Sequence, residues 1–325
     1  MNARDARIGV VGATGAVGTV TLRLLRERGY ENIRAFASQR SAGRALEGGL
    51  VVEEATSDAL LAGGLDLVLF SCGTSASREL VPDAVEGGAL VVDKSSAYRL
   101  VDGYPLVVPE VNGDRAREAI ATTRVVANPN CSAIPLTCVL KPLHDTAGLR
   151  QVRVSTYQAV SGAGAQRMEQ LRAEPPEQHD LAFDWTWEGD ETEEESKIRA
   201  EARKILELPN LPLSATTVRV PVLVGHAQAV WIETEKPLLP EHAEAVLAGA
   251  PGVRLVETPT PRAATQTEDV LVGRIRPDHA ADGESLVLFL ACDNLVKGAA
   301  LNALQIADLL LEPAQAAAGQ GLIET

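Results

Sequence analysis

The apolar positions in the first 130 residues form short runs separated by stretches with helical spacing. The runs predict buried strands, bounded by turn residues, at 7–12, 33–37, 65–70 and 89–93. Between them, apolar residues recur at helical spacing up to Gly29 and again over 78–86. Strands that alternate with helices indicate a parallel, doubly wound sheet, and therefore a Rossmann-like α/β fold.

The pattern changes after about residue 150, where longer strands with partly alternating polarity are predicted. These strands cover 150–160, 214–223, 228–235 and 285–292. Alternation is typical of a sheet with one face toward solvent, so we expect a second, α+β domain. The segment 297–311 predicts an amphipathic helix, followed by a frayed tail of small residues at 314–321. We therefore expect one domain of residues 1–130 plus 298–325 and another of residues 131–297.

Composition narrows the class of protein. The chain has 325 residues, 46% of them apolar, and a formal net charge of −14. This charge disfavours binding to nucleic acid and to anionic membrane surfaces, whereas a small anionic substrate can still bind where a few basic residues converge. The N-terminus lacks the pattern of a signal peptide, and no apolar run approaches the length of a membrane span. We therefore expect a cytoplasmic protein without nucleic-acid or membrane partners.

A glycine-rich loop lies between the first predicted strand and the first predicted helix. It reads G-A-T-G-A-V-G over residues 12–18. Glycines at this junction let the backbone turn tightly and approach a pyrophosphate, whose charge then faces the helix N-terminus. The spacing differs from the usual G-x-G-x-x-G, and a plain turn is the alternative to a dinucleotide site. The predicted cofactor contacts here are Gly12, Thr14, Gly15, Ala16 and Val17.

The end of the second predicted strand indicates which dinucleotide binds. NAD sites usually carry an acidic residue there, which holds the ribose hydroxyls. This chain instead has A-S-Q-R-S-A-G-R over residues 37–44, with hydroxyls and two arginines but no acid. Such groups receive a 2′-phosphate, so the sequence predicts NADP, with Ser38, Arg40 and Ser41 as contacts. The alternative is a solvated basic loop.

One of the four cysteines has the surroundings of a nucleophile. Cys131 follows a predicted strand and precedes an apolar helix, and the N–H groups of a helix start favour thiolate over thiol. A small buried helix residue is the alternative, and it suits Cys138 better, while Cys72 and Cys292 are expected to be structural. No pair has C-x-x-C spacing, so zinc and redox motifs are unsupported and no metal is predicted.

One histidine stands out among the five. His226 lies at a Gly-His break between two predicted strands, and Arg219 precedes it within the same segment. From this spacing alone, a histidine in a surface turn is the favoured interpretation.

Eight short motifs occur in order across nearly the whole chain: GATGAVG, SxRSAGR, VPEVN, PNCS, STYQAVSGAG, VRVPVxxGH, VGRIR and DNLxKGAAxNxxQIA. Together they resemble aspartate-semialdehyde dehydrogenase, an NADP-dependent family of lysine, threonine and methionine synthesis. The resemblance implies a phosphorylating aldehyde dehydrogenase that reduces L-aspartyl 4-phosphate to aspartate semialdehyde. It also implies that the first domain binds the dinucleotide and that the second serves catalysis and dimerisation, in a homodimer or homotetramer.

The resemblance also assigns the site residues. It implies Cys131 as the nucleophile, Gln158 as the residue that orients the reacting group, and His226 as the acid–base catalyst. Substrate contacts are implied for Arg219 at the α-carboxylate, Arg99 and Lys197 at the phosphate, Glu194 at the amino group, and Asn130. Further cofactor contacts are expected at Ser71, Gly73, Ser161, Gly162 and Asn294.

The implied chemistry requires these residue types. A thiolate displaces phosphate from the acyl phosphate, while cations hold both ends of the substrate. The resulting thioester accepts hydride from the nicotinamide, and the oxyanion forms beside backbone N–H groups at the helix start. Imidazole can move the proton near neutral pH.

The middle of the chain departs from the family. The segment 164–191 is shorter here, so we expect subunit contacts and substrate specificity to differ there. The acidic run 184–195 is expected to be mostly a solvated helix entry, with a functional acidic patch as the alternative. Trp185 and Trp187 are expected to cover surface that the shortening leaves bare. Lys94 is an added cation that either contributes to phosphate binding or pairs with an acid.

Other functions stay open from the sequence. One is a paralogue that acts on a related acyl phosphate or another activated acyl group in a specialised pathway. N-acetyl-glutamyl-phosphate reductase shares the expected architecture, but SGAG, VRVPV and DNLxKGAA fit it poorly. A noncatalytic NADP-binding partner or regulator is the third, and the presence of Cys131, Gln158, Arg219 and His226 together argues against it.

Overall fold

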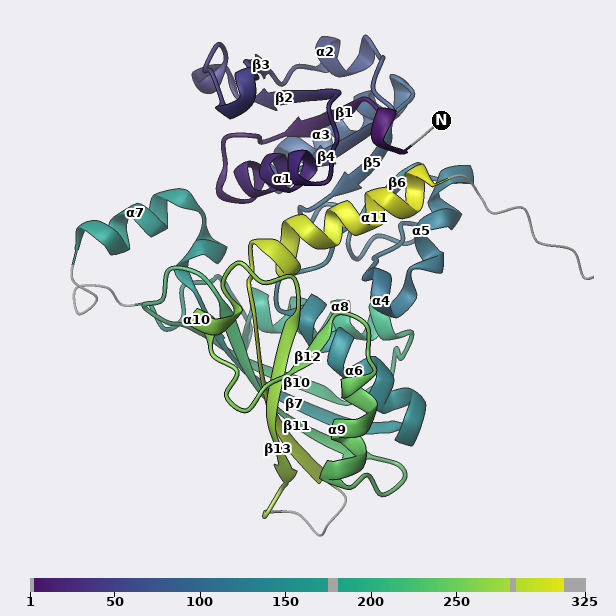
Figure 1. Cartoon of the computed structure of the whole chain (residues 1–325), viewed down its shortest axis with the longest axis vertical. Coiled ribbons are helices and arrows are strands. Elements are labelled where there is room, and N and C mark those ends of the chain that lie inside the picture. The colour runs from purple at the N-terminus through teal and green to yellow at the C-terminus, as the bar shows by residue number, and fades with distance from the viewer. Residues whose placement is uncertain (1–2, 175–180, 281–284, 313–325) are drawn as a thin grey trace, which may run out of the picture.

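The computed structural model describes residues 3–174, 181–280 and 285–312 and contains two six-stranded sheets (Figure 1). The predicted tail at 314–321 lies outside these residues. Within them, no helix is both long and apolar enough to cross a membrane. The predicted combination of a doubly wound sheet with a second α+β unit is confirmed.

The first sheet is parallel throughout, with strand order β3-β2-β1-β4-β5-β6. Its strands are β1 (Ile8–Val11), β2 (Ile33–Ala37), β3 (Val52–Glu54), β4 (Leu67–Phe70), β5 (Leu90–Asp93) and β6 (Val125–Ala127). The connecting helices are α1 (Ala16–Glu27), α2 (Ser57–Leu61), α3 (Thr74–Glu86), α4 (Pro109–Asn112) and α5 (Asp114–Glu118). Every residue of β1 and β4 is buried, as continuous apolar runs require in a sheet covered on both faces. The predicted strands of this region are confirmed.

The second sheet is mixed, with strand order β10-β7-β11-β14-β13-β12. Its strands are β7 (Leu149–Gln158), β10 (Leu213–Arg219), β11 (His226–Thr234), β12 (Val253–Leu255), β13 (Val270–Pro277) and β14 (Ser285–Cys292). Apolar residues of one face pack against α6 (Ala133–Ala147), α8 (Glu193–Leu206) and α9 (Pro240–Ala248). Burial alternates along β7, so only alternate side chains reach this core.

One predicted strand of the second sheet is too long. The prediction extends to residue 223, whereas β10 ends at Arg219. Pro221 lies just beyond, and proline has no backbone N–H to donate to a neighbouring strand. The early end of β10 leaves the segment up to Gly225 free to turn into β11.

The last helix returns to the first sheet. A π-helical turn (Val296–Ala300) leads into α11 (Leu301–Leu311), which shares a hydrophobic core with β1 and α1 (Figure 1). The predicted amphipathic character is wrong for the first half of this segment, where residues 296–304 are all buried, and holds for the second half, where Gln305, Asp308 and Leu309 are partly exposed. The helix packs against α1, α5 and β5, so it has apolar neighbours on several sides.

The acidic run was predicted as one solvated helix entry, and the structure corrects this. A two-stranded hairpin, β8 (Trp187–Glu188) with β9 (Glu191–Thr192), precedes the helix, and α8 begins only at Glu193. Thr192 and Glu195 form a capping box, in which each side chain accepts from the other residue's backbone N–H. Glu194 and Glu195 are buried, because they face the second sheet rather than solvent. Short helices α7 (Ala165–Ala173) and α10 (Pro261–Ala264) complete this part.

Candidate active site

One pocket lies where the carboxyl ends of the first sheet's strands face the start of α6. Ser71, Cys72 and Lys94 line it from the strand ends, and Cys131 lines it from the residues just before α6. The remaining wall comes from the turn after β7 and from the π-helical turn, through Ser161, Gly162, Asn294 and Gly298. The structure therefore brings together residues predicted for the cofactor and for catalysis.

The glycine loop has the geometry of a dinucleotide site. Gly12 has φ +83°, and a Cβ there would lie 2.4 Å from the carbonyl oxygen of Ser71. A Cβ at Gly18 would lie 2.1 Å from the carbonyl oxygen of Gly12, so neither position accepts a larger residue. Helix α1 starts directly after Gly15, which provides no side-chain cap for its first N–H groups. Those N–H groups and the bare backbone fit a bound pyrophosphate.

The loop that follows β2 adjoins the glycine loop. Thr14 Oγ1 donates to Ser41 Oγ at 3.4 Å, and the Ser38 and Arg40 side chains are exposed beside them. A second cavity, lined by Gly12 and Ser38 among others, continues the first, because Cys72 lines both. Cys72 is therefore a wall residue of the site, whereas the sequence predicted a structural role; Cys138 and Cys292 are buried as expected. Gly73 precedes α3 as its N-cap residue.

Cys131 and His226 form a pair. The sulfur of Cys131 lies 3.3 Å from His226 Nε2, and the backbone N–H of Ala159 donates to His226 Nδ1 at 3.0 Å. Because Nδ1 accepts a hydrogen bond, the proton of the neutral ring is on Nε2, which points to the sulfur. The interpretation of His226 as a surface turn residue is wrong: it is the first residue of β11 and is 1% exposed.

Burial dominates the electrostatics of this pair. It raises the pKa of the Cys131 thiol to about 12, and Glu194 adds to the rise, while Arg99 and Arg219 oppose it. Burial, together with Arg219, lowers the pKa of His226 to about 3. The predicted thiolate is therefore wrong for the ligand-free site, where a neutral thiol faces a neutral imidazole. One helix-start N–H is also already occupied, since Ser132 N–H donates to Asn130 Oδ1 at 2.7 Å.

A buried carboxylate joins the residues beside the sulfur. Glu194 accepts from Asn130 Nδ2 at 3.0 Å and from Gln158 Nε2 at 2.9 Å, and all three side chains are buried. The amide of Gln158 is thereby fixed at the end of β7. These three predicted residues gather around Cys131 as the resemblance implied.

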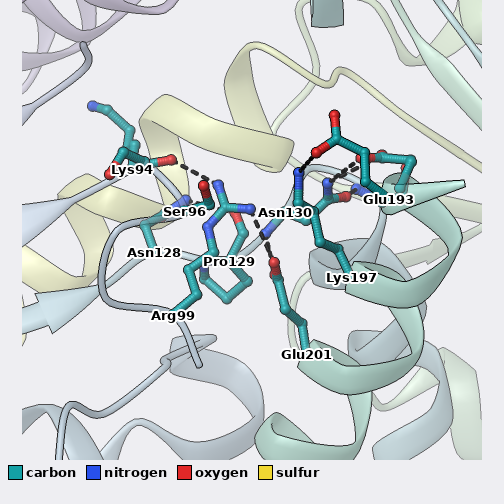
Figure 2. A network of polar contacts seen from close by, with 12 residues as sticks. Lys94, Ser96, Arg99, Asn128, Pro129, Asn130, Glu193, Lys197 and Glu201 are labelled. Carbon is teal, nitrogen blue, oxygen red and sulfur yellow. Dashed lines mark hydrogen bonds and ion pairs between the residues drawn. The ribbon is translucent and has the colours of Figure 1, made fainter. Parts of the chain in front are cut away.

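Arg99 is held by a carboxylate that the sequence analysis missed. Figure 2 shows Arg99 between the main chain of Lys94 and the side chain of Glu201. Arg99 Nη1 donates to Glu201 Oε1 at 3.0 Å, and the other oxygen of Glu201 accepts from the Asn130 N–H at 2.6 Å. Glu201 lies seven residues after Glu194, on the same face of α8, and this helical spacing is the signal that could have found it.

Two predicted phosphate ligands have other partners. Lys197 Nζ donates to Glu193 Oε2 at 2.8 Å, one turn back along α8 (Figure 2). Lys94 Nζ donates to the hydroxyl of Thr21 at 3.1 Å rather than to a carboxylate, and burial lowers the pKa of Lys94 to about 7.

Arg219 is almost fully buried. It is 5% exposed, Nη1 donates to the carbonyl oxygen of Ala159 at 3.1 Å, and burial lowers its pKa. Gly162 leaves the space for this arrangement, since a Cβ there would lie 3.0 Å from Arg219 Nη1 and 3.3 Å from His226 Nε2.

The π-helical turn closes the pocket from the other side. A Cβ at Gly298 would lie 3.1 Å from the Cβ of Cys131, so this turn approaches the nucleophile closely. Asn294 precedes the turn, and its amide donates to Ser161 Oγ at 2.8 Å while its oxygen accepts from the Gly225 N–H at 2.9 Å. Among the described residues, no group of acidic, histidine or cysteine side chains could hold a metal ion.

Two family models match the chain. The model described as the NAD binding domain of semialdehyde dehydrogenase matches residues 7–119. The model described as the dimerisation domain of semialdehyde dehydrogenase matches residues 140–297. Together they cover the second sheet and all strands of the first sheet except β6.

Individual proteins are similar over nearly the whole chain. The aspartate-semialdehyde dehydrogenase of Aquifex aeolicus is 41% identical over 335 aligned residues, covering 94% of this chain and 98% of the relative. That of Mycolicibacterium smegmatis is 43% identical over 339 residues, covering 93% of this chain and 98% of the relative. Both alignments exceed the 325 residues of this chain, so both relatives contain residues that it lacks. The solved structure of aspartate semialdehyde dehydrogenase II from Vibrio cholerae, complexed with ASA, has a TM-score of 0.89 at 34% identity and covers 94% of this chain and 98% of its own.

Proposed function

Because the chain belongs to the aspartate-semialdehyde dehydrogenase family, we propose that it reduces L-aspartyl 4-phosphate to aspartate semialdehyde with NADPH through a thioester on Cys131. The observation that carries this proposal is the contact of Cys131 with His226, at 3.3 Å, next to a pocket that Cys131 lines together with Arg99 and with Val17 of the glycine loop. A nucleophile, a proton-bearing imidazole and a cation at one place are what acyl transfer from a phosphate requires.

The cofactor assignment rests on the loops that follow β1 and β2. Gly12 and Gly18 allow the close backbone packing that shapes the loop before α1, and the loop after β2 offers hydroxyls and Arg40 without an acidic residue. We therefore assign Gly12, Thr14, Gly15, Ala16 and Val17 to the pyrophosphate region and Ser38, Arg40 and Ser41 to a 2′-phosphate. Ser71, Gly73, Ser161, Gly162 and Asn294 are assigned to the remainder of the cofactor.

The substrate assignment follows the charges around the sulfur. We assign the phosphate to Arg99, Lys197 and Asn130, the α-carboxylate to Arg219 and the amino group to Glu194. Glu194 raises the pKa of the thiol, and the two arginines lower it. A substrate ammonium beside Glu194 offsets the effect of that carboxylate, whereas the substrate phosphate and α-carboxylate offset the effects of Arg99 and Arg219.

The chemistry proceeds in two stages on Cys131. The thiol of Cys131 attacks the acyl carbon, the bond to the phosphate oxygen breaks, and phosphate leaves with the electron pair and takes up the thiol proton. NADPH, when bound, supplies the hydride that reduces the thioester carbon. Collapse of the tetrahedral oxyanion then breaks the carbon–sulfur bond and releases the aldehyde. His226 Nε2–H donates first to the sulfur and then to the developing oxyanion, while Gln158 fixes the reacting group.

Membership of this family also indicates how the protein assembles and where it is located. We propose a dinucleotide-binding domain of residues 1–130 plus 298–325, a catalytic and dimerisation domain of residues 131–297, and a cytoplasmic homodimer or homotetramer. The face of the second sheet opposite α6, α8 and α9 supports dimerisation, because Tyr157 is 38% exposed there and its ring lies 6.1 Å from that of Phe289. The four cysteines are free, as a reducing compartment requires.

Aldehyde-dependent formation of NADPH in phosphate buffer tests the proposal. Wild-type protein and Cys131→Ala are compared, with Cys138→Ala as a matched control because Cys138 lies seven residues further on, buried within α6. We expect turnover by the wild type and the control and none by Cys131→Ala. Equal rates for all three proteins would reject the thioester.

A further inference from the structure

Side chains from the shortened segment gather around Arg219. Asp184 Oδ2 lies 3.9 Å from Arg219 Nε and 3.6 Å from Arg167 Nε, so one carboxylate is shared between two guanidinium groups. The ring of Trp185 lies against the guanidinium carbon of Arg219, 4.3 Å from the ring centroid. Arg167 belongs to α7, on the other side of the turn that follows β7.

Both guanidinium groups have unused hydrogen-bonding capacity at this point. Arg167 Nε and Arg219 Nε are buried, and neither has a hydrogen-bond partner among the described residues. Their distances to Asp184 exceed those of an N–H···O hydrogen bond, so Asp184 compensates charge without satisfying either donor. A buried donor without a partner is unfavourable, and a carboxylate that approaches more closely would relieve it.

One edge of the Arg219 guanidinium has no hydrogen-bond partner among the described residues. Trp185 covers a face of the guanidinium, and Nη1 is engaged by the carbonyl oxygen of Ala159. The remaining Nε edge is the one that Asp184 approaches. A ligand carboxylate that binds this edge in the bidentate manner typical of arginine therefore has to take the place of Asp184.

We infer that Asp184 is the resident counter-ion of Arg219, and that an incoming substrate carboxylate displaces it toward Arg167. This inference rests on the proposed function, which assigns the substrate α-carboxylate to Arg219. Asp184 is 32% exposed and already lies closer to Arg167 than to Arg219, so it keeps a cationic partner after displacement. Trp185 is a positioning residue, because it fixes the plane of the guanidinium through contact with its face.

This exchange of carboxylates favours a substrate with a charged carboxylate over one with a neutral group at the same position. The substrate carboxylate replaces that of Asp184 at Arg219. The ion pair therefore contributes to the binding free energy only by the difference between the new ion pair and the one that it replaces. A neutral carboxamide cannot replace Asp184, because it has no negative charge to pair with Arg219. Removing the charge of Asp184 thus strengthens carboxylate binding, and removing Arg167 weakens it because Asp184 loses its alternative partner.

Binding of an unreactive probe tests the inference without turnover. The probes are L-2-aminobutyrate and its amide, which share the carbon skeleton and differ in the carboxylate. Binding is followed by the fluorescence of Trp185 in a protein whose other two tryptophans, Trp187 and Trp231, are replaced by phenylalanine. Asp184→Asn is compared with Asp190→Asn, an exposed site on the nearby hairpin.

We expect Asp184→Asn to lower the Kd of the carboxylate probe about threefold, as a partly exposed ion pair allows, and Asp190→Asn to leave it unchanged. Arg167→Gln raises this Kd by a similar factor, and Arg172→Gln, exposed on the same helix, does not. The amide responds to none of these changes.

Several results would overturn the inference. They are a higher Kd in Asp184→Asn, an equal effect of Asp190→Asn, an amide that gains as much as the carboxylate, or no carboxylate-dependent fluorescence change in any protein. Failure of the proposed function has a different signature, in which the probe binds as expected but aspartate semialdehyde yields no NADPH.

Discussion

The thiol of Cys131 should be unreactive in the ligand-free enzyme at neutral pH. Burial raises its pKa from an ordinary 9.0 to about 12. A rise of about three units makes the thiolate about a thousandfold scarcer than in an ordinary cysteine, and only the thiolate is alkylated. We therefore expect alkylation of Cys131 by iodoacetamide to be slower by about this factor than alkylation of an exposed cysteine peptide.

The pH profile of alkylation shows which effect on the pKa of Cys131 is larger: burial, which raises it, or the N–H groups at the helix start, which lower it. The rate at Cys131 is measured by mass spectrometry of its peptide from about pH 6 to pH 10, which lies below the raised pKa. The rate should climb through the whole range, because each pH unit yields about tenfold more thiolate. A plateau near neutral pH would refute the reasoning, since it would mean that the N–H groups before α6 outweigh the loss of hydration.

A charge change sharpens this test. Glu194 raises the pKa of the thiol, so Glu194→Gln should lower this pKa and accelerate alkylation at a fixed pH. Glu193→Gln removes the same charge from the neighbouring position of α8, where the carboxylate pairs with Lys197 at the helix surface, and should leave the rate unchanged. Equal behaviour of the two variants would contradict a specific effect of Glu194.

Three further changes probe the cofactor loop, the carboxylate pocket and the phosphate site. Arg40→Ala should raise the KM for NADPH about tenfold and leave that for NADH unchanged, and unaltered selectivity would reject the 2′-phosphate assignment. Gly162→Ala places a methyl group 3.0 Å from Nη1 of Arg219, so kcat/KM should fall at least about tenfold with an unchanged Tm. Gly249→Ala is the control and should leave kcat/KM unchanged, because its Cβ has only one neighbouring atom, at 3.8 Å. Glu201→Gln removes the ion pair that holds Arg99, and the KM for phosphate should rise more than the KM for the aldehyde; equal changes would assign Glu201 to the fold alone.

The elements that the sequence predicted well are those whose burial is uniform. Strands β1 and β4 are buried on both faces, so a short apolar run identifies them without knowledge of their neighbours. Strand β3 escapes this pattern because only Val52 among its residues is buried. Helix α11 was expected to be amphipathic along its whole length, and only the packing of α1, α5 and β5 around it explains why its polar residue Asn302 is buried.

Site residues that belong to a local sequence motif could be predicted, whereas properties that depend on contacts between distant segments could not. The glycine loop and Cys131 are marked by local sequence, whereas the burial of His226 depends on a contact with Ala159, 67 residues earlier. The raised pKa of the thiol likewise follows from what surrounds it rather than from its place before α6. The contact of Trp185 with Arg219 joins two segments with no shared pattern, so no periodicity could indicate it.

The proposed mechanism requires the acyl group to pass through a covalent bond to the sulfur of Cys131. The enzyme is incubated with aspartate semialdehyde and NADP but without phosphate. Water is then the only acceptor for the acyl group, so the thioester should accumulate. Mass spectrometry of the digested protein should then find an aspartyl group on the peptide that contains Cys131, lost on addition of hydroxylamine or phosphate. An unmodified peptide, in a sample that still forms NADPH when phosphate is added, would contradict the account.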